Sequence, residues 1–324
     1  MRRRDFITLV GGAAVARPLA ALAQEAGRTY RIGGLSSGPR SSPLMDAMFD
    51  EVRRFGFIEG QNLTVYWHQY LKHIDLIPEF AEEFVKARVD VIFAAGDIAI
   101  RAAQRATPTI PILGTTENMV GSGLVKSLAR PGGNTTGTSI LAADLDGKRQ
   151  ELLIEAVPGL RRMAALADSN STPSPQLQAL QDAARARNVE LSIHRITSAE
   201  EITPAIDAAK ASGAEALNVL SAPTLFSSRQ IIMQRVAALH LPAIYQFPEE
   251  ADEGGFVAYG PRVVQMFREL MARQLVQLLR GVKPADIPIE QPTKFELVIN
   301  LKTANALNLP VPETLLARAD KLIE

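Results

Sequence analysis

The sequence contains no cysteine, which excludes disulfides, thiolate metal sites, cysteine nucleophiles and lipid attachment through an N-terminal cysteine. It also lacks an excess of either charge, because 35 Lys and Arg residues balance 35 Asp and Glu residues. No global positive field is available to hold a polyanion, so we expect no nucleic-acid partner. A mean hydropathy of +0.04 excludes a multi-span membrane protein. The 324 residues suffice for about two domains with separate cores.

Motifs for catalysis and metal binding are missing as well. The histidines are scattered and lack the spacing of metal ligands: His68, His73, His194 and His240. There is no nucleophile elbow, no phosphate-binding loop and no glycine-rich dinucleotide motif after the first predicted strand. We interpret the acidic pairs Glu82-Glu83 and Glu249-Glu250 as surface charge. We therefore expect no metal, no cofactor and no catalytic residue, and the protein is not expected to be an enzyme.

The first 23 residues have the pattern of an export signal. Three arginines at positions 2–4 precede a short apolar stretch, residues 8–16, and the segment ends in Ala21-Leu22-Ala23. The apolar stretch is too short to span a membrane. Arg3-Arg4-Asp5-Phe6-Ile7 resembles the twin-arginine consensus. We expect residues 1–23 to be a cleaved twin-arginine signal and the mature protein to be periplasmic; the alternative is a frayed N-terminal helix.

After this segment, short apolar runs alternate with amphipathic stretches in two successive rounds. The first round predicts strands at 30–35, 63–67, 89–94 and 110–113, with helices at 43–55, 78–87 and 98–106. A turn at 130–134 and a polar strand or linker at 135–140 follow. The second round predicts strands at 162–167, 189–193, 216–220 and 243–245, with helices at 145–157, 175–187, 199–211 and 227–239. This alternation predicts an α/β fold of two doubly wound parallel-sheet lobes.

The C-terminal part contains a long amphipathic helix, residues 263–279, and a strand at 295–300. The helix is too apolar to stand alone, so we expect it to pack on the first lobe and the strand to cross to the second. Three crossings of the chain would then form a hinge. The expected boundaries are 28–140 plus 258–290 for lobe 1 and 141–257 plus 291–324 for lobe 2.

Small hydrogen-bonding residues follow most of the predicted strands. In open parallel sheets, ligands bind beyond the carboxyl ends of the strands, so these residues are candidate ligand contacts: Ser36, Ser37, Gly96, Asp97, Thr115, Thr116, Glu117, Asp168, Asn170 and Ser221. Each one alone is also typical of a helix N-cap. The best donors to a carboxylate are Ser37, Thr116 and Ser221. The acids that suit an ammonium group, or merely cap a helix, are Asp97, Glu117 and Asp168.

Aromatic residues make up only 6% of the chain, so those beside the expected cleft are informative about ligand shape. Tyr245 and Phe247 are the leading candidates. Phe226 either lines the pocket or packs on the sheet. Trp67 is expected in the core. Arg229 either pairs with an anionic solute or forms a salt bridge on the surface of its helix.

Four segments resemble those of a known family. They are residues 2–9 with the following Gly-Gly-Ala-Ala, Gly56-Phe57-Ile58-Glu59-Gly60-Gln61-Asn62, Leu128-Ala129-Arg130-Pro131-Gly132-Gly133-Asn134, and residues 291–303, which begin Gln291-Pro292-Thr293-Lys294-Phe295. On these segments the chain resembles the ABC transporter substrate-binding proteins of the tryptophan/tyrosine-type group, with the type I periplasmic binding protein fold. The resemblance implies a periplasmic receptor that delivers a small-molecule solute to a membrane permease driven by an ATPase, with no chemistry of its own. We expect a monomer.

Two departures from the family pattern concern the ligand. Relatives often have Asp-Pro-Val where this chain has Glu117-Asn118-Met119, and Asp-Pro-Phe-Phe where it has residues 222–226. Losing an aspartate at each place weakens the case for a ligand ammonium, since a buried cation without a counter-charge is costly. Glu117 is the residue that could compensate. Aromatic or other amino acids and amine-free aromatic or other organic acids both remain candidate solutes.

Other functions are open at this stage. A sensory binding protein would present its ligand to a membrane receptor, and the sequence does not separate it from a transport receptor. An α/β enzyme would need a reactive constellation that the sequence does not offer. A repressor with this fold is disfavoured by the export signal and by the lack of a preceding DNA-binding domain.

Overall fold

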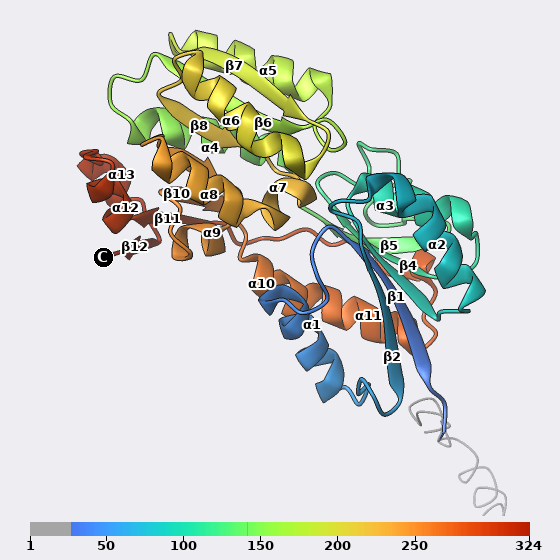
Figure 1. Cartoon of the computed structure of the whole chain (residues 1–324). Helices are drawn as coiled ribbons and strands as arrows, with labels where there is room; N and C mark the ends of the chain where they lie inside the picture. Colours follow the sequence, from blue (N-terminus) through green and yellow to red (C-terminus); the bar gives the residue numbers. More distant parts are fainter. Residues whose placement is uncertain (1–26, 141) are drawn as a thin grey trace, which may run out of the picture.

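The computed structural model describes residues 27–140 and 142–324; the expected export signal lies outside them. The described chain forms two lobes, each built on one sheet (Figure 1). The first sheet is wholly parallel, in the order β2-β1-β3-β4-β5. Its strands are β1 (Tyr30–Ser36), β2 (Leu63–Gln69), β3 (Val91–Ala95), β4 (Ile112–Thr116) and β5 (Thr135–Ser139). The polar segment at 135–140 is therefore a strand, fully buried beside β4.

The second sheet has the order β12-β11-β10-β9-β8-β6-β7, and its one antiparallel pair is β10 with β11. Its strands are β6 (Arg162–Asp168), β7 (Glu190–Ile196), β8 (Ala216–Val219), β9 (Ala243–Tyr245), β10 (Val257–Gly260), β11 (Glu296–Asn300) and β12 (Lys321–Ile323). The α/β architecture predicted from the sequence is confirmed. Parallel strands covered on both faces are mostly apolar, which is why short apolar runs identified most of them; the polar β5 is an exception.

Helices cover both faces of each sheet. In the first lobe they are α1 (Pro43–Arg54), η2 (Ile74–Leu76), α2 (Ile77–Lys86), α3 (Asp97–Ala106), α10 (Val263–Met266), the π-helical η4 (Phe267–Met271), α11 (Ala272–Leu279) and η5 (Pro284–Asp286). In the second they are α4 (Ala142–Ala156), α5 (Ser174–Ala186), η3 (Ala199–Glu201), α6 (Ile202–Ala211), α7 (Pro223–Ser227), α8 (Arg229–Ala238), α9 (Pro248–Asp252), α12 (Leu301–Ala306) and α13 (Glu313–Leu316). Among these described helices, none is long and apolar enough to cross a membrane.

The long C-terminal helix packs on the first lobe, beside α1 (Figure 1). Its residues Val263, Phe267 and Leu275 share one buried core with Met48 of α1 and Phe93 of β3. A π-helical turn interrupts it between α10 and α11. The other face of the first sheet is covered by α2 and α3.

Glycines in β1 allow two large rings to approach the first sheet closely. A Cβ on Gly33 would lie 2.5 Å from the Phe84 ring of α2, and one on Gly34 would lie 2.0 Å from the Trp67 ring. Both distances are shorter than side-chain atoms tolerate, so glycine is required at each position. The sheet therefore holds Trp67 in a fixed place next to Phe93.

The chain crosses between the lobes three times: after β5, after β10 and before β11 (Figure 1). Two of the crossing segments are hydrogen-bonded to each other, because Ser139 N donates to Glu290 O at 2.9 Å and Glu290 N donates to Gly137 O at 3.0 Å. The expected boundary assigns residues from 258 onward to the first lobe, but β10, which includes Ala258, pairs with β9 and β11 in the second sheet. Val257 and Ala258 are fully buried there, so the chain leaves the second lobe only after Gly260.

Candidate functional site

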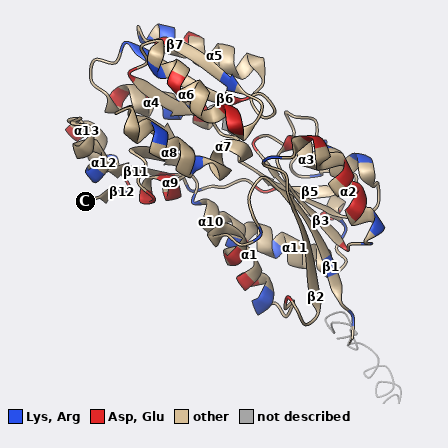
Figure 2. Cartoon of the chain, in the orientation of Figure 1, with Lys and Arg blue, Asp and Glu red and all other residues tan. Residues whose placement is uncertain are grey.

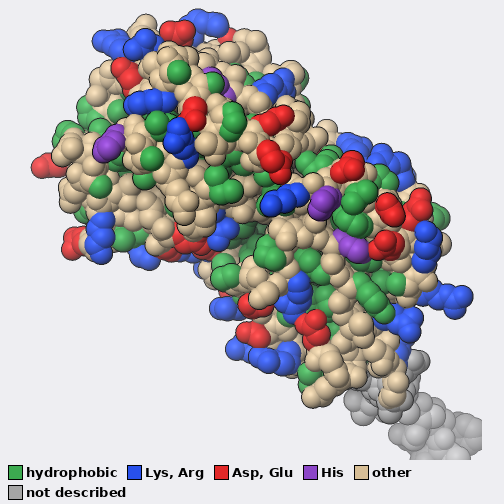
Figure 3. Space-filling view, viewed as in Figure 1, with side chains coloured by type: hydrophobic (Ala, Val, Ile, Leu, Met, Phe, Trp, Pro, Cys, Tyr) green, Lys and Arg blue, Asp and Glu red, His purple; other side chains and the backbone are tan. Residues whose placement is uncertain are grey.

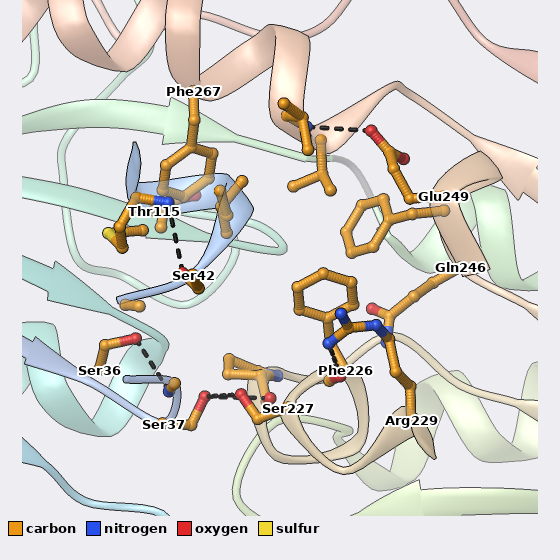
Figure 4. Close-up of a pocket in the computed structure, with 18 of the residues that line it drawn as sticks. Ser36, Ser37, Ser42, Thr115, Phe226, Ser227, Arg229, Gln246, Glu249 and Phe267 are labelled. Atoms are coloured by element: carbon orange, nitrogen blue, oxygen red, sulfur yellow. Dashed lines mark hydrogen bonds between the residues drawn. The ribbon is translucent and has the colours of Figure 1, made fainter. Parts of the chain in front are cut away.

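A cavity lies between the two lobes, where the carboxyl ends of strands from both sheets face each other (Figure 4). Its volume is about 1120 Å³ when the open mouth is included. The first lobe contributes the loop after β1, the start of α1 and the end of β4, with α10 and Phe267. The second lobe contributes α7, the first residue of α8 and the segment from Gln246 to Glu249. This placement follows the rule that open α/β sheets bind ligands beyond their strand ends.

Phenylalanine rings form much of the apolar wall. Phe226 and Phe247 meet edge to face, with ring centroids 5.1 Å apart. Phe93 meets Phe267 in the same manner at 6.1 Å. Behind Phe93, the Trp67 ring is stacked at 5.7 Å and its Nε1 donates to Gly38 O at 3.1 Å. These rings suit an aromatic or flat apolar group.

Serine hydroxyls line the mouth and join the lobes. Ser37 Oγ of the first lobe donates to Pro223 O at 3.0 Å, and it lies 2.8 Å from Ser227 Oγ, with either hydroxyl able to donate (Figure 4). Next to it, Gly38 N donates to Ser36 Oγ at 3.2 Å. Because Pro223 and Ser227 belong to α7 of the second lobe, these contacts hold the lobes together at the edge of the cavity.

Two glutamates on the wall are poorly compensated. The pKa of Glu117 is raised to about 7, mainly by burial and less by the charges of Asp146 and Asp97, against the lowering effects of a Ser221 hydrogen bond and of Arg149. Burial also raises the pKa of Glu249, whose Oε1 accepts from Val264 N at 3.0 Å. The Oε2 atoms of Glu117 and Glu249 are buried without a hydrogen-bond partner. The wall therefore contains carboxylate oxygens that could receive a ligand donor.

A buried ion pair lies behind this wall, in the second lobe. Asp146 and Arg149 of α4 are 0% and 1% exposed and bind each other. Arg149 Nη1 also donates to Tyr259 O at 3.1 Å. Asp146 accepts from Gln176 Nε2 at 2.6 Å and from Ser221 N at 3.3 Å. The pair thus fixes the end of β8 beside the cavity.

Arg229 is the cationic side chain that the described part of the chain places on the cavity wall. Its guanidinium lies 4.7 Å from the centre of the Phe226 ring. It binds both oxygens of Glu253, at 2.7 and 2.9 Å. This geometry matches the salt-bridge alternative, because Nε and Nη2 of Arg229 both donate to Glu253.

Several predicted site residues lie on the cavity wall: Ser36, Ser37, Thr115, Glu117, Phe226 and Phe247. The structure places the others elsewhere. Asp97 accepts a hydrogen bond from Thr116, beside Gly96, the first residue before α3. Asp168 Oδ1 accepts from Asn170 N at 2.8 Å and stabilises a turn. Ser221 donates to Gln246 Oε1 at 2.9 Å behind the wall.

Tyr245 also lies away from the cavity. Its side chain is 1% exposed and packs in the core between the second sheet and α6 and α8. The neighbouring Ile244 faces the opposite core, as the alternation of a strand requires. Gln246, the next residue along, lines the cavity instead.

The interpretation of Glu249-Glu250 as surface charge is wrong. Glu250 is 0% exposed, its Oε2 accepts from Phe247 N at 2.8 Å, and burial raises its pKa to about 8. Both acids accept hydrogen bonds at helix starts, Glu250 at α9 and Glu249 at α10, where the helix dipole favours negative charge. Glu82-Glu83 is exposed, as expected, and Glu83 lies 2.7 Å from His68 Nε2.

Other wall residues have no signal in the sequence. Phe93 lies in the middle of an apolar strand, and Phe267 comes from the C-terminal helix, so both resemble ordinary core residues. Ser227 follows Phe226 at the end of α7. Charged residues of both signs are mixed over the visible faces of both lobes (Figures 2 and 3). Within residues 27–140 and 142–324, no three His, Asp or Glu side chains could together hold a metal ion.

Comparisons with known proteins identify the family. A family model described as ABC transporter substrate binding protein matches residues 37–323. The chain is 28% identical over 259 residues to a tyrosine-binding protein of Clostridioides difficile, an alignment that covers 78% of this chain and 73% of the relative. Among solved structures, a conserved domain protein of Vibrio cholerae is 22% identical with a TM-score of 0.80, covering 91% of this chain and 99% of that one.

A second solved structure is an ABC domain from Streptococcus pneumonia in complex with L-Trp. It is 21% identical with a TM-score of 0.78, and the match covers 91% of this chain and 100% of that one. These structural likenesses confirm the type I periplasmic binding protein fold expected from the resemblance. Since the family model spans both lobes and all three crossings, the chain belongs to the family of ABC transporter substrate-binding proteins.

Proposed function

We propose that this protein is the periplasmic solute receptor of an ABC importer and binds a small carboxylate-bearing organic solute in the interlobe cavity. The solute is an aromatic or other amino acid, or an aromatic or other organic acid. The observation that carries the proposal is a phenylalanine-walled cavity built from both lobes, with Ser37 and Ser227 bridging the lobes at its edge. Closure of two such lobes around a solute would remove it from water.

The comparisons support an aromatic solute, because one similar protein is a tyrosine-binding protein and another is an ABC domain solved in complex with L-Trp. We further propose that residues 1–23 direct export, that the mature chain acts as a monomer, and that its closed form hands the solute unchanged to a membrane permease. Expression of the full chain in a bacterial host tests export: the protein recovered from the periplasm should begin at Gln24. Recovery of the uncleaved chain from the cytoplasm would contradict this part of the proposal.

Trp67 provides a direct test of solute binding in the cavity. It is the chain's only tryptophan, and it stacks on Phe93 of the cavity wall. We expect its emission to change, and the melting temperature to rise, when a carboxylate-bearing aromatic solute is added. Phe226→Ala should weaken that binding, because it removes a ring from the wall.

Phe80→Ala is a matched control, since Phe80 is also partly buried but stacks on His68 away from the cavity. It should leave binding unchanged. Equal loss of binding in both variants would contradict binding of the solute in this cavity. A lack of any emission change or thermal shift across aromatic and other amino acids and organic acids would overturn it.

A further inference from the structure

The charges on the cavity wall do not cancel. Among the described residues, the charged side chains that line it are Glu117, Arg229, Glu249 and Glu253. Arg229 and Glu253 neutralise each other through their two hydrogen bonds. Glu117 and Glu249 remain, each with a buried oxygen that has no partner. The described wall therefore has surplus negative charge and no unpaired cationic side chain.

The groups behind the wall do not supply the missing positive charge. The guanidinium that lowers the pKa of Glu117 is that of Arg149, which already binds Asp146 and Tyr259 O. On the other side, Asp97 of α3 adds a further carboxylate close to Glu117. Glu250 of α9 also faces Arg149. Buried carboxyl groups outnumber the guanidinium that serves them, and ionising all of them is costly unless another cation accompanies them; otherwise some keep a proton.

The remaining polar groups of the wall are neutral. Gln246 Nε2 and Thr115 Oγ1 belong to side chains that are more than nine-tenths buried, and neither atom has a hydrogen-bond partner. They can hydrogen-bond a polar group of a solute without adding charge. The faces of aromatic rings such as Phe226 attract cations. The unpaired carboxylate oxygens and the ring faces therefore suit a solute with an aromatic or apolar body and a positive charge, while Gln246 Nε2 suits an acceptor atom of the same solute.

We infer that the solute carries a protonated amine, and that Glu117 is the residue that selects for it. This inference rests on the proposed function, because it names the substrate class of the same cavity. Glu117 is the better partner of the two wall acids, since Glu249 already accepts from Val264 N at the start of α10. A carboxylate on the solute meets only neutral donors, so amines without a carboxylate bind, and acids without an amine bind more weakly.

Proton release gives an independent readout. The pKa of Glu117 is about 7 because it is buried, with Asp146, Asp97, Arg149 and Ser221 facing it from neighbouring elements. A bound ammonium keeps Glu117 ionised, so binding near pH 7 expels the proton that part of the population holds. Affinity for amines should therefore fall as the pH decreases below about 7.

The experiment compares three compounds with one body: phenylalanine, phenethylamine, which lacks the carboxylate, and 3-phenylpropionate, which lacks the amine. The tyrosine and tryptophan series are tested in parallel. Binding to the intact mature protein is measured by titration calorimetry in two buffers of different ionisation enthalpy, and by thermal shift. In at least one series the amino acid and the amine should bind, with proton release. The acid should bind about 10- to 100-fold more weakly, as expected for a lost hydrogen bond between charged groups.

Glu117→Gln should remove the preference for amines and the proton release, whereas the exposed control Glu82→Gln should keep both. If Glu117→Gln does not fold, the binding of the three compounds to the wild-type protein still tests the inference. Equal or tighter binding of the acids overturns the inference and leaves the proposed function intact. If no compound of any series and no other amino acid or organic acid binds, both the proposed function and the inference are overturned.

Discussion

Arg149→Met tests whether the buried ion pair behind the cavity is necessary for stability. Arg149 and Asp146 are essentially unexposed, so the variant leaves Asp146 without its counter-charge and Tyr259 O without its donor. Breaking a buried pair from one side costs about 3–5 kcal/mol. We expect the free energy of unfolding, measured by urea denaturation with far-UV circular dichroism, to fall by about that amount.

Asp182 and Arg185 provide a matched control in the same lobe. They have the same three-residue spacing on α5 and pair at 2.9 Å, but their side chains are 57% and 75% exposed. Arg185→Met should change stability by less than about 0.5 kcal/mol, because solvent screens an exposed pair. The double variant Asp146→Asn with Arg149→Met should recover part of the loss, since it leaves no unpaired charge.

The stability loss of Arg149→Met should depend on pH. Burial already raises the pKa of Asp146 despite the attraction of Arg149, and loss of Arg149 raises that pKa further. Protonation relieves the unpaired charge, so the variant should lose less stability at pH 5 than at pH 8. A loss no larger than that of Arg185→Met, or one independent of pH, would refute the reasoning.

Three further predictions concern the backbone, the lobe contact and a buried acid. Gly137→Ala should lower the free energy of unfolding, measured by urea denaturation, by at least about 3 kcal/mol, because the φ of Gly137 is +142° and a Cβ would lie 1.8 Å from a carbonyl oxygen of β4. The control Gly147→Ala lies on helix α4 with open space around its Cβ and should leave the free energy of unfolding unchanged or raise it. Ser37→Ala should raise the Kd for the solute in calorimetry by up to about tenfold, because it removes the hydrogen bonds to Pro223 O and Ser227 that hold the lobes closed; an unchanged Kd would contradict that role. Burial raises the pKa of Glu250 from 4.5 to about 8, so the folded state retains a proton that the unfolded state loses, and stability should decrease as the pH rises from about 5 to 8; Glu250→Gln should flatten that dependence in thermal melts, and an unaltered slope would exclude Glu250 as its source.

Much of the fold follows from local patterns in the sequence. Strands covered on both faces are mostly apolar, so β3 and the middle of β6 stand out between amphipathic helices. The second crossing was harder to predict, because residues 254–261 contain several glycines and a proline, which are also typical of a loop. Pairing with β9 and β11 makes residues 257–260 a strand, and that tertiary contact is not visible in the local sequence.

The candidate site was only partly predictable for a similar reason. The strand-end rule found Ser37 and Glu117, which directly follow β1 and β4, and Thr115, which lies at the carboxyl end of β4. It does not say which strand ends face the other lobe, so Asp168 was included although it stabilises a turn. Nor does it identify Phe267, which reaches the cavity through a helix that begins far along the chain.

Closure and charge are coupled in this arrangement. Glu117 belongs to the first lobe, whereas Asp146 and Arg149 belong to the second. Bringing the lobes together therefore buries Glu117 beside the paired Asp146 and Arg149, and the loss of water around Glu117 opposes closure unless a proton or a cation accompanies it. A neutral or anionic solute leaves this cost in place, while an ammonium removes it at the moment the lobes meet. Selection by Glu117 thus acts on the closed state, so an amine-free acid that enters the open cleft would not offset the free-energy cost of closing the two lobes.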